Sequence, residues 1–172
     1  ADLTKPADIE RLVEETVSKF GRVDILITNS GPPPKGDPMK LTDDDWDHAF
    51  NLVFMSVLRL CRAALPYMEK QGWGRVISIT STSVKQPLDE LYLSSITRIP
   101  ILPLFKILSN RYSSKGISFN IVCPGPFLTE GERKMFEKIA KEQRITYEEA
   151  MNQFIKGDIP MGRIGNPEEL AD

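Results

Sequence analysis

Two hydroxyl side chains in the middle of the chain are candidates for acid–base chemistry at a carbonyl or an alcohol. Tyr92 lies in the stretch Leu-Tyr-Leu-Ser-Ser-Ile-Thr-Arg (91–98), and Ser81 follows the apolar stretch 76–80. A tyrosine has a pKa of about 10, so it gives up a proton near neutral pH only beside a fixed positive charge. A lysine one helical turn later would supply that charge, but residue 96 is isoleucine. Tyr92 is therefore either a proton donor served by another cation or an aromatic residue of a substrate pocket or subunit contact.

Three further residues belong to the same question. Lys85 follows Ser81 in the next loop, and Arg98 lies about two helical turns after Tyr92, so each is a substitute cation. Asn51 lies within a predicted helix, where asparagine is disfavoured. It is either a functional polar group or a residue on the solvent side of that helix.

These residues need a scaffold, and the hydrophobic pattern predicts alternating helices and strands. Thr4 and Pro6 are expected to begin the first helix, Thr42 with Asp45 resembles a capping box, and Pro100 and Pro103 should bend their helix. The expected helices are 4–20, 42–71, 91–114, two short ones within 130–157 and one beginning at 166; the expected strands are 23–28, 75–80 and 117–122.

Strands separated by helices of ten or more residues pair in parallel through right-handed crossovers. The predicted class is α/β with a doubly wound parallel sheet, whose strands are covered on both faces. Ligands bind such sheets beyond the carboxyl ends of the strands. The loops 29–36, 81–90 and 123–131 are therefore the expected site.

Composition narrows the function classes. The 22 basic and 24 acidic residues nearly cancel, which predicts neither a nucleic-acid partner nor an anionic membrane surface. No apolar run approaches the roughly 20 residues of a membrane span. A single histidine argues against a zinc site, and Cys61 and Cys123 are expected to be reduced thiols. We expect a cytoplasmic protein.

Five motifs, in order, resemble the short-chain dehydrogenase/reductase family, and in particular its 3-oxoacyl-carrier-protein-reductase-like members. The motifs are DILITNSG (24–31), WDHAFNLV (46–53), GRVISITS (74–81), GISFNIVCPGPFLTE (116–130) and IPMGRIGNPEELAD (159–172). Singly each is weak, whereas five in the right order and spacing are strong.

The resemblance implies a Rossmann-like fold and an oxidoreductase that uses NAD or NADP on a small-molecule carbonyl or secondary alcohol, with a 3-oxoacyl compound as one option. Ser81 would orient the substrate oxygen, Asn51 would support a proton relay, and Tyr92 is the candidate donor. The implied cofactor contacts are Asp2, Leu3, Asn29, Ser30, Gly31, Pro124, Gly125, Phe127 and Thr129. The helices 42–71 and 91–114 resemble the pair that forms family dimers, so a homodimer or homotetramer is implied by analogy.

The chain departs from the family pattern in two ways. The Gly-rich turn that holds the cofactor diphosphate and the last strand are absent, so we expect one partial Rossmann-like domain (1–172) with a helical lid at 130–157. The Tyr-x-x-x-Lys motif is also absent: Leu91 stands at the tyrosine position and Ser95 at the lysine position. The alternative function is a non-catalytic, dinucleotide-binding relative that serves as a structural or regulatory subunit.

Overall fold

The computed structural model describes residues 1–88 and 91–171. They form two compact units, Ala1–Cys123 and Pro124–Asp172, and each is described by itself.

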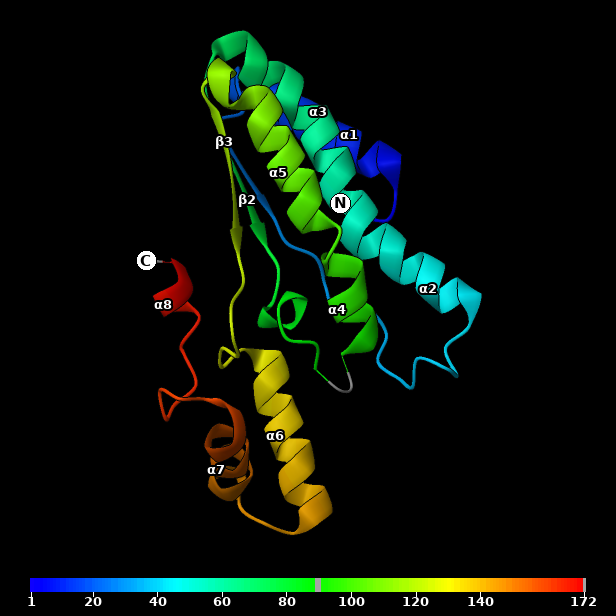
Figure 1. Ribbon diagram of the computed structural model, residues 1–172, viewed down its shortest axis with the longest axis vertical. Helices are drawn as coiled ribbons and strands as arrows, with labels where there is room; N and C mark the ends of the chain where they lie inside the picture. Colours follow the sequence, from blue (N-terminus) through cyan, green and yellow to red (C-terminus); the bar gives the residue numbers. More distant parts are fainter. Residues whose placement is uncertain (89–90, 172) are drawn as a thin grey trace. The chain divides into compact units, whose positions relative to one another are not determined.

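The first unit is built on a three-stranded parallel sheet (Figure 1). Its strands are β1 (Ile25–Thr28), β2 (Gly74–Ile79) and β3 (Ile117–Val122), in the order β1-β2-β3. In the register of the sheet Thr28 lies opposite Ser78, and Ile79 lies opposite Val122. The predicted α/β class with a parallel sheet is confirmed.

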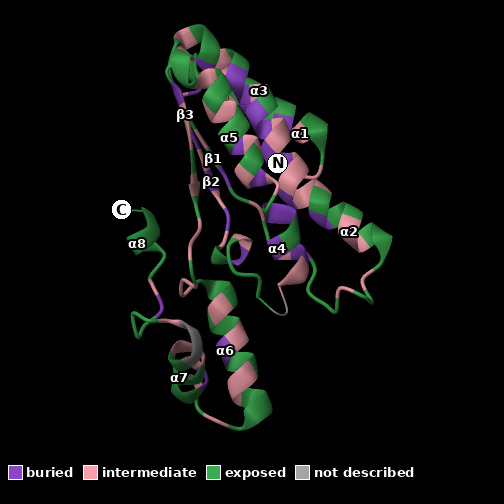
Figure 2. Cartoon of the chain, viewed as in Figure 1, coloured by how far each residue is buried: buried purple, intermediate pink, exposed green. Residues whose placement is uncertain are grey.

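Helices lie between the strands along the chain and cover one face of the sheet. The helical segments of this unit are α1 (Pro6–Phe20), α2 (Asp43–Phe50), η1 (Asn51–Met55), α3 (Ser56–Gln71), η2 (Thr82–Val84), α4 (Tyr92–Arg98), α5 (Ile101–Tyr112) and η3 (Ser113–Lys115). Helix α3 contacts β1 and β2, α5 contacts β3, and α1 packs on α3. The buried positions follow these contacts (Figure 2), so this face carries the core.

The predicted helix 42–71 exists, but its middle is not a regular α-helix. It begins with the expected capping box, in which Thr42 and Asp45 bond each other's backbone N–H. Residues 51–55 then form a π-helical turn, which the sequence pattern did not predict. By length and composition this 29-residue stretch would suit a membrane span, yet 44% of its most apolar window is buried inside the protein. A core helix passes the same test, so the evidence for a membrane is weak.

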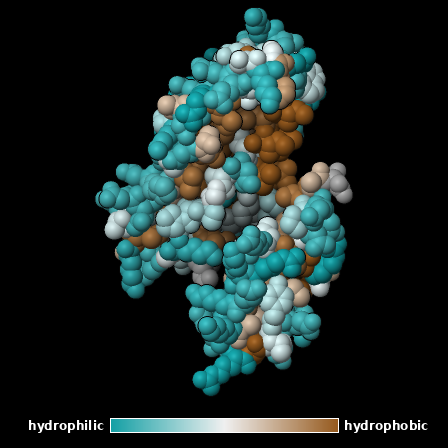
Figure 3. All heavy atoms as spheres, turned by 180° about the vertical axis from the view of Figure 1, so that it is seen from behind, coloured by the Kyte–Doolittle hydropathy of each residue, from teal (hydrophilic) through white to brown (hydrophobic). Residues whose placement is uncertain are grey.

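The opposite face of the sheet is apolar and open. The side chains of Ile25 and Ile27 are each 58% exposed, and Val122 on β3 is exposed as well. The rear view shows apolar side chains gathered over the part of the first unit that holds the sheet (Figure 3). The prediction that β1 is covered on both faces is therefore wrong for the described residues: Leu26 packs against the core, whereas Ile25 and Ile27 point to the other face and are exposed.

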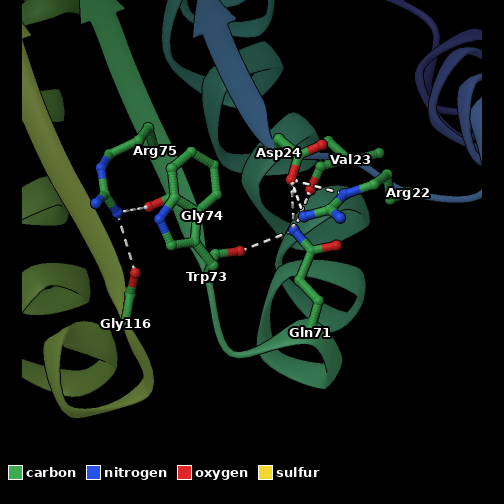
Figure 4. A network of polar contacts seen from close by, with 8 residues as sticks. All are labelled: Arg22, Val23, Asp24, Gln71, Trp73, Gly74, Arg75 and Gly116. Atoms are coloured by element: carbon green, nitrogen blue, oxygen red, sulfur yellow. Dashed lines mark hydrogen bonds and ion pairs between the residues drawn. The ribbon is translucent and has the colours of Figure 1, made fainter.

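A polar network closes the amino end of the sheet (Figure 4). Gln71 Nε2 donates to the carbonyls of Val23 and Trp73, both at 2.8 Å, and to Asp24 at 3.3 Å. Arg75 stacks over the Trp73 ring and donates to the Gly74 carbonyl. One side chain at the end of α3 thus joins the segments that enter β1 and β2.

The close packing at this end also depends on one glycine. Gly116 has φ +76°, and a Cβ there would lie 2.2 Å from the backbone oxygen of Gly72. Only a residue without a side chain fits this approach between the turn after α3 and the turn before β3.

The predicted helix 91–114 is divided in two. Helix α4 ends at Arg98 and α5 begins at Ile101, with Pro100 between them. A proline cannot donate a backbone hydrogen bond and its ring crowds the preceding turn. The expected bend at Pro100 is confirmed, and it is a break between two helices. Pro103 causes no break: it lies in the first turn of α5, which continues to Tyr112, and a proline is tolerated in a first turn.

The second unit is mainly a helical pair. Its helices are α6 (Glu130–Gln143), α7 (Tyr147–Asp158) and α8 (Glu168–Ala171), and α6 packs against α7. Phe136 is fully buried in edge-on contact with Tyr147 and Phe154. Phe127 pairs with Gly165 through a parallel bridge, so the two ends of the segment 128–164 lie next to each other. Two helices were predicted here, and their role as a mobile lid stays a prediction.

Candidate functional site

The carboxyl ends of β1 and β2 deliver two candidate residues to one edge of the sheet. Because the two strands are parallel and Thr28 pairs with Ser78, Asn29 and Ser81 leave the sheet at the same edge. The end of β3 is tied there as well: Thr80 donates to the Val122 carbonyl from its N–H at 2.8 Å and from its hydroxyl at 3.1 Å. This is the edge at which parallel sheets bind ligands.

Ser81 is held by its own loop, and its hydroxyl hydrogen has no partner among the described residues. Its side-chain oxygen accepts from the Ser83 N–H at 3.1 Å and so caps the short helix η2. The hydroxyl of a serine can donate one bond while accepting another. The residue is half-buried, so its O–H is available to a substrate oxygen at the rim. Capping and substrate binding are compatible uses of the same side chain.

Asn51 is the first residue of the π-helical turn, and both polar atoms of its side-chain amide form hydrogen bonds. Its Nδ2 donates to the Thr4 carbonyl at 3.1 Å, and its Oδ1 accepts from Arg59 Nη1 at 2.5 Å. Eight residues along an α-helix would place Arg59 about 80° away, but the extra residue of a π turn brings it to within about 20°. The π turn therefore aligns Arg59 with Asn51.

Asn51 also fixes the turn that contains Asp2 and Leu3. Asp2 Oδ1 accepts from the Thr4 N–H at 2.9 Å and from the Thr4 hydroxyl at 2.7 Å. These bonds lower the pKa of the Asp2 carboxyl. The expectation that Thr4 caps α1 is wrong: Lys5 is the N-cap residue, without a side-chain cap, because the Thr4 hydroxyl is bonded to Asp2. A cofactor role for Asp2 and Leu3 stays a prediction.

Tyr92 begins α4 but lies beside the direction that the family motif requires. The first turn is helical, because the Ser95 N–H donates to the Leu91 carbonyl at 2.8 Å. One residue is about 100° of rotation, so Tyr92 points well away from the direction of Leu91. It is half-buried, as an aromatic residue of a pocket or contact would be.

The two substitute cations differ sharply in environment. Lys85 ends η2 and is exposed. Arg98 ends α4 and is 8% exposed, with Nη1 donating to the Ser94 hydroxyl at 2.5 Å. Burial lowers the pKa of the Arg98 guanidinium below its ordinary value. Arg98 is the cation that the fold encloses.

The loop after β1 leaves room for a ligand against its backbone. Asn29 and Gly31 are exposed and Ser30 is half-buried. A Cβ at Gly31 would meet nothing within 4 Å, and its φ lies outside the left-handed region. Among the described residues, therefore, neither packing nor backbone strain requires glycine there, and the backbone at Gly31 is open to a ligand.

The second unit carries the remaining predicted cofactor residues. Pro124 begins this unit, and Gly125 has open space around the position of a Cβ. Phe127 pairs with Gly165 through the bridge, and Thr129 caps α6 by accepting from the Glu132 N–H at 3.4 Å. Their role beside a nicotinamide stays a prediction.

Other chemistries find little support in the part of the chain that the structure describes. No group of three or more His, Cys, Asp or Glu side chains is placed to hold a metal ion among residues 1–88 and 91–171. Cys61 and Cys123 are both free thiols, and burial raises the pKa of Cys61 to about 12.

Sequence reasoning missed two partners of the site. Arg59 was not singled out, although a cation two turns after Asn51 within a largely apolar helix is a usable signal. The backbone carbonyl of Thr4 has no sequence signal, since any residue carries one. The π turn that aligns Asn51 with Arg59 was equally invisible.

The comparisons with known proteins agree with this geometry. The family model of the short chain dehydrogenases matches residues 1–140. The chain is 29% identical, over 99% of its length, to D-beta-hydroxybutyrate dehydrogenase of Rhizobium meliloti and to 3-oxoacyl-[acyl-carrier-protein] reductase FabG of Salmonella typhimurium. It superposes on L-sorbose reductase of Gluconobacter frateurii, crystallised with NADPH and L-sorbose, with a TM-score of 0.95 at 27% identity over 99% of this chain.

The chain covers only part of the length of each of these proteins. The chain spans 66% of the R. meliloti enzyme, 65% of the S. typhimurium enzyme and 65% of the L-sorbose reductase chain. The family model nevertheless covers well over half of the present chain, and the order of strands and site loops is the one its motifs predict. The chain belongs to the short chain dehydrogenase family.

Proposed function

We propose that the protein is an NAD(P)-dependent oxidoreductase that transfers hydride between nicotinamide and a carbonyl or secondary alcohol. The proposal rests on the position and the hydrogen bonding of Ser81. This residue lies at the carboxyl edge of a parallel sheet and accepts from the Ser83 N–H at 3.1 Å, and its own O–H has no acceptor among residues 1–88 and 91–171. A pre-positioned donor of this kind stabilises charge on a reacting oxygen.

The described residues fit a dinucleotide. In the first unit, the open backbone at Gly31 allows a flat ligand to approach closely, and Asn29 offers a side-chain amide beside it. Asp2 and Leu3 would hold the adenine end, in a turn secured by Asn51. When bound, the cofactor supplies the hydride. L-sorbose reductase binds NADPH in its crystal, which supports NADP as one of the two options.

In this proposal the protein side chains hold the substrate and manage its proton. Ser81 would donate to the carbonyl oxygen, and Asn51 would keep the helix and the Asp2 turn in place. Tyr92 remains the candidate donor, from a direction about 100° away from the family position. Asn51 uses one hydrogen of Nδ2 and one lone pair of Oδ1 in its two bonds. Each atom can form a second bond, so a proton relay through Asn51 would use the remaining hydrogen or lone pair.

The substrate is proposed to be a small carbonyl compound or alcohol, with 3-oxoacyl compounds as the first to test. Relatives named for such chemistry include the S. typhimurium reductase and the R. meliloti hydroxybutyrate dehydrogenase. We also propose a cytoplasmic location and no nucleic-acid or membrane partner, because the charges nearly cancel.

A homodimer or homotetramer through the helices of 42–71 and 91–114 is proposed as well. Apolar side chains are exposed along these helices, where a second subunit would cover them: Phe50, Ile96, Ile99 and Ile107. Sedimentation of the purified protein tests this point directly.

The test of the function is oxidation of NADH or NADPH with a panel of ketones and 3-oxoacyl thioesters. Ser81→Ala should lower turnover roughly 100-fold, since it removes one pre-positioned donor. Ser114→Ala is the matched control, because Ser114 is exposed in the turn before β3. Turnover that survives Ser81→Ala would remove the basis of the proposal. Thermal stabilisation by the cofactor without any turnover would favour a dinucleotide-binding subunit.

A further inference from the structure

The proposed reaction leaves one buried cation unexplained. Arg98 is 8% exposed; its Nη1 donates to the Ser94 hydroxyl at 2.5 Å and to the Ser94 carbonyl at 3.4 Å. Its Nε has no hydrogen-bond partner in the described structure. Among residues 1–88 and 91–171, no carboxylate forms an ion pair with it. A buried charge that has no counter-charge among these residues is costly there, so its presence asks for a function.

Arg98 shares a helix face with a second unsatisfied group. Ser95 is 3% exposed, and its hydroxyl has no partner in the described residues. Three residues separate the two, which is about 60° around the helix, and Leu91 lies within about 20° of Arg98. Helical side chains point back toward the helix amino end, as the bond to Ser94 shows. The bond to Ser94 therefore places the guanidinium one turn back along α4, at the level of Ser94 and of its neighbour Ser95, the position of the family lysine.

The neighbours of α4 carry the candidate chemistry. Helix α4 packs against η1, which begins at Asn51, and against η2, which Ser81 caps. Within η2, Ser83 is fully buried and its hydroxyl is unsatisfied as well. Three unsatisfied polar groups thus lie on two elements in contact, next to the residues proposed to bind the substrate oxygen.

We infer that Arg98 supplies the fixed positive charge of the active site, in place of a lysine at position 95. The inference rests on the proposed function. Reduction of a carbonyl builds negative charge on its oxygen, and a fixed cation in a water-poor interior stabilises that charge. Arg98 is held by Ser94 and acts on the reacting groups through its field, which makes it a positioning residue. Lys85 is exposed and supplies no such charge.

The first test compares activity and stability in the same variants. Arg98→Met should lower kcat roughly 100-fold, with little change in the KM for cofactor. Its thermal midpoint should stay unchanged or rise, because the variant removes a buried charge that pairs with no carboxylate of the described residues. Arg98→Lys should regain at least about a tenth of the lost rate, and Arg111→Met, at an exposed site on α5, should match wild type. Should Arg98→Met not fold, Arg98→Gln replaces it.

The second test moves the charge. Ser95→Lys in the Arg98→Met background should restore activity at least about tenfold, whereas Ser95→Lys alone should destabilise the protein through like-charge repulsion. The two substitutions should therefore couple at least about tenfold in the unfolding equilibrium constant. This coupling is measured by unfolding and needs no enzyme activity. If the wild type is inactive on the whole panel, the proposed function fails. The coupling would still test whether the charge of Arg98 lies close to position 95.

Three results would overturn the inference. One is wild-type kcat, within about threefold, in a folded Arg98→Met protein. Another is a KM that rises only for acidic substrates, which would make Arg98 a substrate anchor. The last is the absence of coupling between positions 95 and 98 in stability.

Discussion

The two ends of the sheet are built in opposite ways. At the amino end Gln71 bonds three groups with one amide nitrogen, and Gly116 lies against the backbone of Gly72 with no room for a methyl group. At the carboxyl end Gly31 has open space around it, and the hydroxyls of Thr28 and Ser78 are buried without partners among the described residues.

The comparison indicates that the amino end of the sheet serves stability and the carboxyl end serves function. Bonded, close-packed groups at the amino end leave nothing for a ligand to bind, whereas free donors and open backbone at the carboxyl end are what a ligand needs. Sites that hold unsatisfied groups cost free energy that packing elsewhere must offset. Substitutions at the amino end should therefore change stability, and those at the carboxyl end should change binding and turnover.

Gly116→Ala is the strongest test of the amino end. A Cβ 2.2 Å from the Gly72 oxygen, at φ +76°, must shift the backbone, so the free energy of unfolding should fall by at least about 3 kcal/mol. Denaturant titration followed by circular dichroism measures the loss. Gly21→Ala is the control, because Gly21 has φ +77° but open space, and it should cost only about 1–2 kcal/mol. Equal losses in both variants would show that the close approach has no effect.

Gln71→Ala tests the polar network of the same end. It removes the donor to two backbone carbonyls, so the free energy of unfolding should fall by about 2 kcal/mol. Gln86→Ala provides the comparison at the carboxyl end: Gln86 is exposed, and its loss should stay within about 0.5 kcal/mol. A larger effect at Gln86 than at Gln71 would reverse the assignment of the two ends.

Gly31→Val tests the carboxyl end by binding. The fold has room for the side chain, so the free energy of unfolding should stay within about 0.5 kcal/mol of wild type. A cofactor lying against this backbone would be displaced, and its Kd should rise at least about tenfold, or 1.4 kcal/mol. Quenching of protein fluorescence by NADPH measures this. Unchanged affinity would show that the cofactor does not approach Gly31.

The smallest effect concerns the Asp2 turn. Hydrogen bonds from Thr4 hold the pKa of Asp2 below 3.8, so their contribution to stability is present above that pH and is lost as the pH falls through the lower folded-state value. Thr4→Val removes the hydroxyl donor and should raise the pKa of Asp2 toward 3.8, as NMR titration of its carboxyl carbon would show. Thr16→Val, within α1, should leave it unchanged, because that hydroxyl bonds Leu12.

Much of the scaffold could be predicted because it depends on local pattern. The spacing of apolar residues located all three strands to within two residues, and Thr42 with Asp45 marked a helix start. Pro100 marked a break between helices, since proline acts on its own turn. The edge that carries Asn29 and Ser81 followed from parallel pairing alone.

The rest depends on contacts between distant residues. Ile25 and Ile27 read as buried, but exposure is decided by what lies against a strand. The bond from Asn51 to the Thr4 carbonyl spans 47 positions, and the π turn that aligns Arg59 has no local motif. The burial of Arg98, in contrast with Lys85, likewise appears only in three dimensions.

The bridge between Phe127 and Gly165 has a consequence for how this protein can be altered. A Cβ at Gly165 would press into the Phe127 ring at 2.7 Å, and the Leu128 N–H donates to the Gly165 carbonyl at 2.8 Å, so residues 129–164 leave and return at one clasp. The entropy of closing a loop rises only slowly with its length. We therefore expect the helical pair α6–α7 to tolerate changes of length and sequence, provided that the contacts of Phe127 and Leu128 with Gly165 are kept.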